Sequence, residues 1–87
     1  MEYKTTDELL LEIAYRFKKI RKIRKVSQID LSKRCNVSYA SIKRFEETGE
    51  ISLHSLLKMC VALEIDDVKE LFVNIPYKDI NEVIDDE

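Results

Sequence analysis

The chain has 87 residues, of which 45% are hydrophobic and 37% are charged, and its formal net charge is −2 at pH 7. This length suits one domain with a modest core. No apolar run approaches the ~20 residues that a membrane span needs, and the N-terminus lacks the basic-then-apolar pattern of a secretory signal, so we expect a cytoplasmic protein. Since there is one glycine and one proline, few residues favour loops, and the composition indicates helices with short connections.

The charges are unevenly distributed along the chain. Residues 16–44 hold eleven Lys or Arg and a single acid, Asp30, whereas residues 45–87 hold three Lys and twelve acids. A concentrated basic block attracts phosphates even when the whole chain is slightly acidic. We therefore expect one face to bind nucleic acid and the acidic part to keep the opposite surface away from it. A basic helix lying on a membrane surface is the alternative explanation for the first part of this block.

The first predicted helix begins after Thr5 or Thr6 and runs to about residue 24. Either threonine can cap it, and the acids at positions 7 and 8 suit the positive end of the helix dipole. Apolar residues then recur at helical spacing: Leu9, Leu10, Ile13, Phe17 and Ile20. This pattern predicts an amphipathic helix with one face in the core.

Two short helices joined by a tight corner are predicted over residues 27–46. Ser27 and Ser38 are candidate N-caps, with Asp30 completing a capping box after Ser27. Asn36 stands at the corner, where asparagine tolerates the left-handed conformation. The pattern predicts that the side chains facing the core are Leu31, Cys35, Val37, Ile42 and Phe45. The side chains predicted to face outward are Tyr39, Ala40, Lys43 and Arg44. These features predict a helix-turn-helix with a basic, hydrogen-bonding outer face.

The remaining chain predicts two more helices and a tail. Ser52 is a candidate N-cap for a fourth helix, whose apolar residues are Leu53, Leu56, Leu57, Cys60, Val61 and Leu63. Asp66 or Asp67 opens a fifth helix, whose apolar residues are Val68, Leu71 and Phe72. After residue 75, apolar residues alternate with acids, which fits either a solvated end or a segment that packs on another protein chain.

Nothing in the sequence favours catalysis, a metal or a cofactor. The two cysteines, Cys35 and Cys60, occupy predicted inward positions, so we expect reduced core residues, with a disulfide or redox pair as the alternative. His54 is the single histidine, and no Cys-x-x-Cys pair or glycine-rich phosphate loop is present. We therefore expect neither enzymatic activity nor a metal site.

The residues from 27 to 46 read Ser-Gln-x-x-Leu-Ser-x-x-x-Asn-Val-Ser-x-x-x-Ile-x-Arg-Phe-Glu. This pattern resembles the lambda-repressor-like (Xre-type) DNA-binding domains, which typically read Ser-Gln-x-x-Leu-Ala-x-x-x-Gly-Val-Ser-x-x-x-Ile-x-x-x-Glu. Ser32 stands where alanine is usual and Asn36 where glycine is usual; both are small or tolerate the left-handed conformation. The resemblance covers residues 10–73 and implies a compact, all-α, five-helix domain over residues 1–75. Residues 76–87 form an acidic C-terminal tail outside it.

The resemblance implies a sequence-specific regulator of transcription that binds double-stranded DNA. By this reading it is a dimeric repressor on a palindromic operator, and the helix at residues 38–46 enters the major groove. The side-chain amide of Gln28 would hold a phosphate, as would Ser38 at the start of the recognition helix. Lys25 and Lys33 would add contacts to phosphates that carry no sequence preference.

Base recognition is expected from the outward residues of the recognition helix. Arg44 can donate to both major-groove acceptors of guanine, and Lys43 to guanine or a nearby phosphate. Tyr39 offers a hydroxyl group and an aromatic face, and Ala40 a methyl group that suits thymine. The alternatives are that the Tyr39 ring packs over the turn and that Arg44 is a plain surface charge.

One buried ion pair is implied by the same resemblance. Arg21 resembles the family arginine that pairs with the glutamate ending the recognition helix, which is Glu46 here. Such a pair would fix the first helix against the third. The alternative is that Arg21 is a solvated charge.

Two questions about partners remain open at the level of sequence. One recognition helix reads few base pairs, so we expect a homodimer, with its interface in the fifth helix and the tail. The alternative function is an antitoxin-type module that binds a partner protein through residues 76–87. RNA binding is less favoured, because the sequence offers no aromatic platform for stacking bases.

Overall fold

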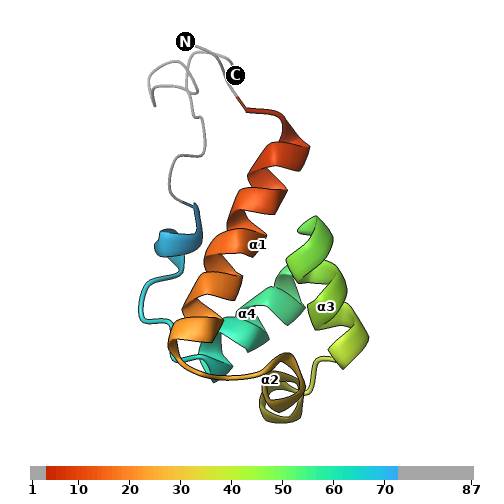
Figure 1. The fold of residues 1–87 in the computed structure, drawn as a ribbon. Coiled ribbons are helices and arrows are strands. Elements are labelled where there is room, and N and C mark those ends of the chain that lie inside the picture. Colours follow the sequence, from red (N-terminus) through yellow and green to blue (C-terminus); the bar gives the residue numbers. More distant parts are fainter. Residues whose placement is uncertain (1–3, 73–87) are drawn as a thin grey trace.

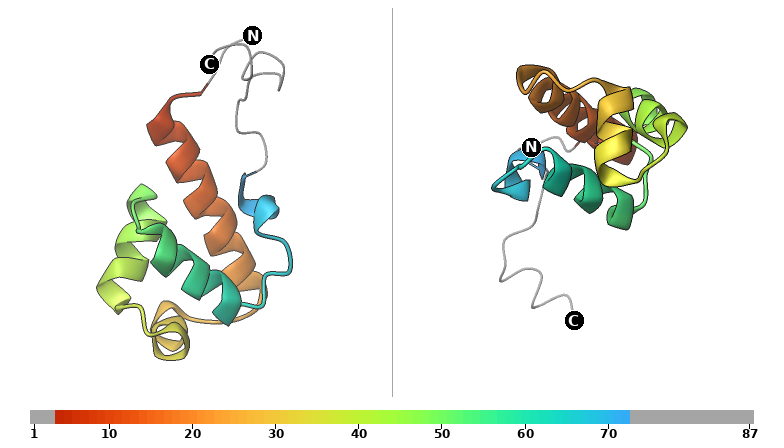
Figure 2. Two further views of the ribbon diagram at one scale, coloured as in Figure 1. Left: turned by 180° about the vertical axis from the view of Figure 1, so that it is seen from behind. Right: turned by 90° about the horizontal axis from the view of Figure 1, so that it is seen from below.

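Four α-helices and a short 3-10 helix make up residues 4–72, the part of the chain that the computed structural model describes. In chain order they are α1 (Thr6–Ile23), α2 (Gln28–Cys35), α3 (Tyr39–Thr48), α4 (Leu53–Ala62) and η1 (Val68–Phe72). The long helix α1 has α3 on one side and η1 on the other, while α2 and α4 close one end of the body (Figure 1). Figure 2 shows the same arrangement from behind and from below. The predicted all-α class is confirmed.

Hydroxyl side chains begin all four α-helices. The N-caps are Thr5, Ser27, Ser38 and Ser52, and each accepts a hydrogen bond from the backbone N–H three residues ahead. Such a bond satisfies one of the N–H groups that a first turn leaves without a helical partner, and it stabilises the helix by ~1 kcal/mol. The short polar residues therefore set where each helix starts, as the sequence predicted.

Left-handed residues end α2 and α3. Asn36 has φ 57° and Gly49 has φ 82°, the conformation that stops a helix and turns the chain. A Cβ atom on Gly49 would lie 2.5 Å from the Leu10 carbonyl oxygen of α1. Only glycine therefore permits both this φ and this close approach, which brings the end of α3 against α1.

The core forms where the apolar stripes of the helices meet. Phe17 of α1 and Phe45 of α3 pack edge to face, with ring centroids 5.4 Å apart and an interplanar angle of 74°. An aromatic pair of this geometry contributes about 0.5–1.5 kcal/mol beyond the burial of its area. The largest fully buried side chains are Phe17, Phe45, Leu31, Ile42, Met59, Leu63, Leu71 and Cys60. Within the helix-turn-helix, all five residues predicted to face inward are buried.

Helix α4 divides its apolar residues between the core and the surface. Leu56 and Cys60 are buried, as is Leu63, which follows the helix. Leu53, Leu57 and Val61 are exposed, Val61 by 77%. None of the helices in residues 4–72 combines the length and the apolar character that crossing a bilayer requires.

The predicted fifth helix is instead the five-residue 3-10 helix η1, so the expected count of five α-helices is not met within residues 4–72. Asp67 opens it by accepting the Lys69 N–H at 3.0 Å. Leu71 is fully buried, and Nη1 of Arg16 donates to its carbonyl at 3.1 Å. A segment this short gains little from α-helical hydrogen bonding, and its docking on α1 suits the tighter 3-10 geometry. The predicted tail, residues 76–87, lies outside the described residues.

Candidate nucleic-acid interface

Helices α2 and α3 and the corner between them form the predicted helix-turn-helix (Figure 1). The Ser32 hydroxyl donates to the Val37 carbonyl at 2.6 Å and so ties α2 to the corner. Asn36 supplies the left-handed turn, and Val37 is buried directly after it. The two residues that depart from the usual family pattern, Ser32 and Asn36, thus both fit this geometry.

The outer face of α3 presents the residues that were predicted to read bases. Tyr39, Ala40, Lys43 and Arg44 are all exposed, and Tyr39 keeps 44% of its surface accessible. Their individual contacts with DNA stay predictions. They lie on the solvent-exposed face of α3, whereas Ile42 and Phe45 are its buried residues.

A buried network joins α1, α2 and α3. Arg21 donates through Nε to Oε2 of Glu46 at 2.7 Å and through Nη2 to Oε1 at 2.8 Å. Its Nη1 donates to the Val26 carbonyl at 2.8 Å. The two charged side chains are only 8% and 2% exposed. The structure therefore contains the ion pair that the resemblance implied, and Arg21 is not a solvated charge.

Gln28 belongs to this network, which the sequence did not predict. Its Nε2 donates to Oε1 of Glu46 at 3.1 Å. One amide hydrogen is used in this bond, and the amide group retains a second hydrogen and its carbonyl oxygen for other partners. The buried ion pair thus orients the side chain that was expected to hold a phosphate.

The hydroxyl group of Ser38 is engaged within α3. It accepts the Ser41 N–H at 3.1 Å and donates to Ser41 Oγ at 2.8 Å. An anion at this site would therefore be bound by the N–H groups at the start of α3 and by the positive end of its helix dipole.

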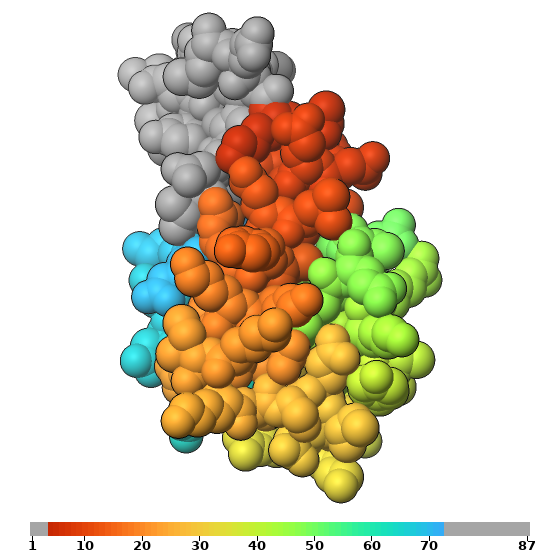
Figure 3. Space-filling model, viewed as in Figure 1, coloured from red at the N-terminus to blue at the C-terminus, as the bar shows by residue number. Residues whose placement is uncertain are grey.

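The predicted phosphate-binding lysines are both exposed. Lys25 has φ 59° and lies in the connection from α1 to α2, while Lys33 lies on α2. In the space-filling view, the surface of α1 continues into that of α2 and then of α3 (Figure 3). The basic block of residues 16–44 therefore lies on elements that adjoin one another, although Arg21 within it is buried and Arg16 bonds to η1.

Arg44 has a partner that the sequence analysis missed. Its Nη2 pairs with the Glu50 carboxylate, which lies just beyond the Gly49 turn. The two side chains are 68% and 56% exposed. The sequence signal was an acid six residues after the arginine, but only the turn geometry brings the two together.

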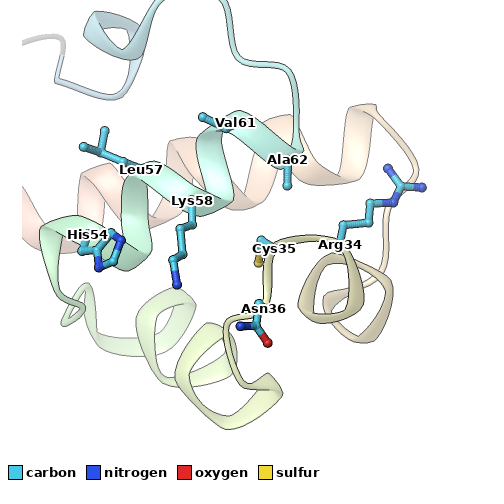
Figure 4. Close-up of a pocket in the computed structure, with 8 residues that line it drawn as sticks. All are labelled: Arg34, Cys35, Asn36, His54, Leu57, Lys58, Val61 and Ala62. Atoms are coloured by element: carbon cyan, nitrogen blue, oxygen red, sulfur yellow. The ribbon is translucent and has the colours of Figure 1, made fainter.

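A separate hollow of about 530 Å³ lies between α2 and α4 (Figure 4). Its wall includes apolar Leu57, Val61 and Ala62, with His54 and Lys58 on α4 and Arg34 on α2.

No metal site is evident in the described part of the chain. Within residues 4–72, no three His, Cys, Asp or Glu side chains gather closely enough to hold a metal ion. Cys35 and Cys60 are both free and buried, and burial raises the pKa of the Cys60 thiol.

Comparison with known families identifies the type of domain that carries this surface. Residues 16–77, more than half of the chain, match the family of Cro/C1-type HTH DNA-binding domains. The chain belongs to this family. The resemblance drawn from residues 27–46 is thereby confirmed.

Two solved structures are similar to this Cro/C1-type domain. Both are mutants of the restriction–modification controller protein C.Esp1396I. A threonine-to-alanine mutant is 29% identical, with a TM-score of 0.67 over 74% of this chain and 91% of the other. A tyrosine-to-phenylalanine mutant is 25% identical, with a TM-score of 0.66 over 91% of this chain and 95% of the other. No curated protein sequence matches the chain.

Proposed function

We propose that this Cro/C1-type domain is a transcriptional regulator that recognises a specific DNA sequence with the outer face of α3. The observation that carries the proposal is the exposed set of Tyr39, Ala40, Lys43 and Arg44 on the second helix of a helix-turn-helix in a DNA-binding family. The similarity to a controller protein supports a regulatory role.

Contacts with the DNA backbone would come first in this mechanism. The positive start of α3 at Ser38 and the spare amide donor of Gln28 suit phosphate oxygens. Lys25 and Lys33 would displace counterions, so binding would weaken as salt rises. Because Glu46 orients Gln28 and is itself held by Arg21, α1 would set the position of the phosphate clamp relative to α3.

Base recognition would then fall to the side chains of α3 in the major groove. Arg44 is the candidate guanine reader, since its planar fork can donate to both O6 and N7. Lys43 would reach guanine or a phosphate, and Ala40 would contact a thymine methyl group. Tyr39 would add a hydroxyl group at the start of the helix.

A dimeric repressor is the form of this function that we propose, with residues 1–75 as the DNA-binding domain and 76–87 as a tail. Two copies would place two α3 helices in major grooves about one DNA turn apart. Leu71, one of the residues on which the predicted interface in the fifth helix rested, is buried against α1 instead. Sedimentation of the chain with a duplex of the preferred sequence tests the stoichiometry: two chains per duplex supports the dimer, and one refutes it.

The function is tested by fluorescence anisotropy with the DNA upstream of the chain's own gene and a scrambled duplex, each at two salt concentrations. We expect the wild type to prefer the natural duplex and to bind more weakly at high salt. Arg44→Ala should lose about 5–150-fold in affinity for that duplex, the effect of ~1–3 kcal/mol expected for a guanine contact. Lys69→Ala, which removes a charge from η1 on the other side of α1, should retain the preference. Equal binding of both duplexes by the wild type refutes sequence-specific recognition.

A further inference from the structure

The exposed ion pair between Arg44 and Glu50 lies at the end of the proposed reading face. Glu50 follows the Gly49 turn that ends α3, and its carboxylate pairs with Nη2 of Arg44. Both side chains are more than half exposed, so burial does not force them together. The pairing instead follows from where the backbone places Glu50.

Three contacts fix the backbone at this point. Gly49 packs against the Leu10 backbone of α1, in a conformation that other residues rarely adopt. The Thr48 hydroxyl accepts the Glu50 N–H at 3.1 Å and donates to the Arg44 carbonyl at 2.8 Å. The position of Glu50 is therefore as well defined as the end of α3 itself.

We propose that Glu50 is a specificity-determining residue, which acts by pairing with Arg44 and suppressing its attraction to phosphates. The inference rests on the proposed function and names a residue that this function did not use. A phosphate attracts a guanidinium through net charge, and an adjacent carboxylate cancels most of that attraction. Guanine O6 and N7 are uncharged acceptors, which bind through the geometry of the donors.

The donor count of Arg44 makes this division workable. A guanidinium carries five N–H donors in a fixed fork, and the pair with Glu50 engages Nη2. The guanidinium has two forks, Nε with Nη2 and Nη1 with Nη2, and each uses a different hydrogen of Nη2. The single bond to Glu50 occupies one of these hydrogens, so the other fork remains for guanine O6 and N7. Glu50 thus lowers binding to DNA of any sequence more than it lowers binding to a duplex with guanine at the correct position.

The experiment begins with selection of a preferred duplex by the wild-type chain from a random-sequence library. Anisotropy then gives the affinities for that duplex and for a scrambled one. Glu50→Gln should bind the scrambled duplex about fivefold more tightly, the upper range for an exposed ion pair, and the preferred duplex within about twofold. The slope of log affinity for the scrambled duplex against log salt should steepen by about 0.9 per chain, the value for one added phosphate contact.

Two controls separate this mechanism from a simple change in charge. Glu47→Gln removes the same charge from an exposed residue of α3 that has no ion pair within residues 4–72, and it should change the specificity ratio by less than about twofold. In an Arg44→Ala background, Glu50→Gln should have no further effect on the ratio, because its partner is absent.

The outcomes distinguish the two proposals. If the wild type selects no sequence, both the proposed function and the role of Glu50 are refuted. If the wild type discriminates and Glu50→Gln discriminates equally well, only the role of Glu50 is refuted. The role of Glu50 is also refuted if Glu47→Gln changes the specificity ratio equally, or if the effect of Glu50→Gln persists without Arg44. General repulsion between acidic side chains and DNA would then explain the effect.

Discussion

Replacing Arg21 with methionine removes the guanidinium that joins α1 to α3. Methionine keeps much of the length of the arginine stem, so the change is mainly the loss of charge and of donors. Three bonds of 2.7–2.8 Å disappear, two to the Glu46 carboxylate and one to the Val26 carbonyl. Glu46, whose side chain is 2% exposed, keeps the bond from Gln28 at 3.1 Å.

The expected loss of unfolding free energy is about 3–5 kcal/mol, as for other buried pairs from which one partner is removed. The loss combines the three missing bonds with the penalty of leaving the buried Glu46 carboxylate without its counter-charge. A domain of this length is stabilised by roughly 4–13 kcal/mol in total. Arg21→Met should therefore lower the denaturation midpoint strongly or leave the domain largely unfolded.

Urea denaturation, monitored by the far-UV circular dichroism signal of the helices, measures this loss. The double variant Arg21→Met with Glu46→Met removes both charges, and it should be more stable than Arg21→Met alone. Arg24→Met is the matched control, because its nearest carboxylate oxygen, on Glu64, lies 3.9 Å away and is exposed; it should cost less than about 1 kcal/mol. The reasoning fails if Arg21→Met is as mild as Arg24→Met, or if the double variant is less stable than Arg21→Met alone.

Two further predictions concern the turn after α3 and the buried thiol. Gly49→Ala should lower the unfolding free energy by more than about 2 kcal/mol in the same assay, since a left-handed φ costs about 1–2 kcal/mol and the new Cβ would meet the Leu10 backbone. Ala40→Gly, on the exposed face of α3, is the control and should cost only about 1 kcal/mol. Similar losses for the two variants would contradict the argument. Burial raises the pKa of the Cys60 thiol above its ordinary value of 9.0, so the folded state binds the thiol proton more tightly than the unfolded state does. The stability that this proton contributes is therefore complete below pH 9.0 and is lost as the pH rises above 9.0. Wild type should therefore lose more stability between pH 8 and pH 10 than Cys60→Ala, and equal losses would count against the burial argument.

Features that depend on neighbouring residues were predictable from the sequence. The serine and threonine caps, the left-handed Asn36 and the inward stripe of the helix-turn-helix each follow from residue type and spacing over a few positions. Met59, which is fully buried, was missed although it lies three residues after Leu56, so the same periodicity could have identified it. The ion pair of Arg21 with Glu46 was inferred from a family resemblance, because residues 25 positions apart give no local signal of contact.

Features that depend on the meeting of separate elements were not predictable in this way. The bond from Gln28 to Glu46 and the pair of Arg44 with Glu50 require the packing of α2 on α3 and the turn at Gly49. The fifth helical segment was placed correctly near Asp67, but its type depends on docking against α1. Composition and periodicity favour a helix there without distinguishing five tightly wound residues from a longer α-helix.

The docking of η1 has a consequence for how the chain can be extended. Leu71 and its carbonyl, held by Arg16, attach the end of the described part to the side of α1 opposite α3 (Figure 1). Phe72, the last described residue, therefore belongs to an element on the other side of α1 from the proposed reading face. A fluorophore or an affinity handle attached at η1 would therefore lie away from a duplex bound at the proposed reading face. The domain thus has its proposed DNA-binding surface at α3 and a separate site for attachments at η1.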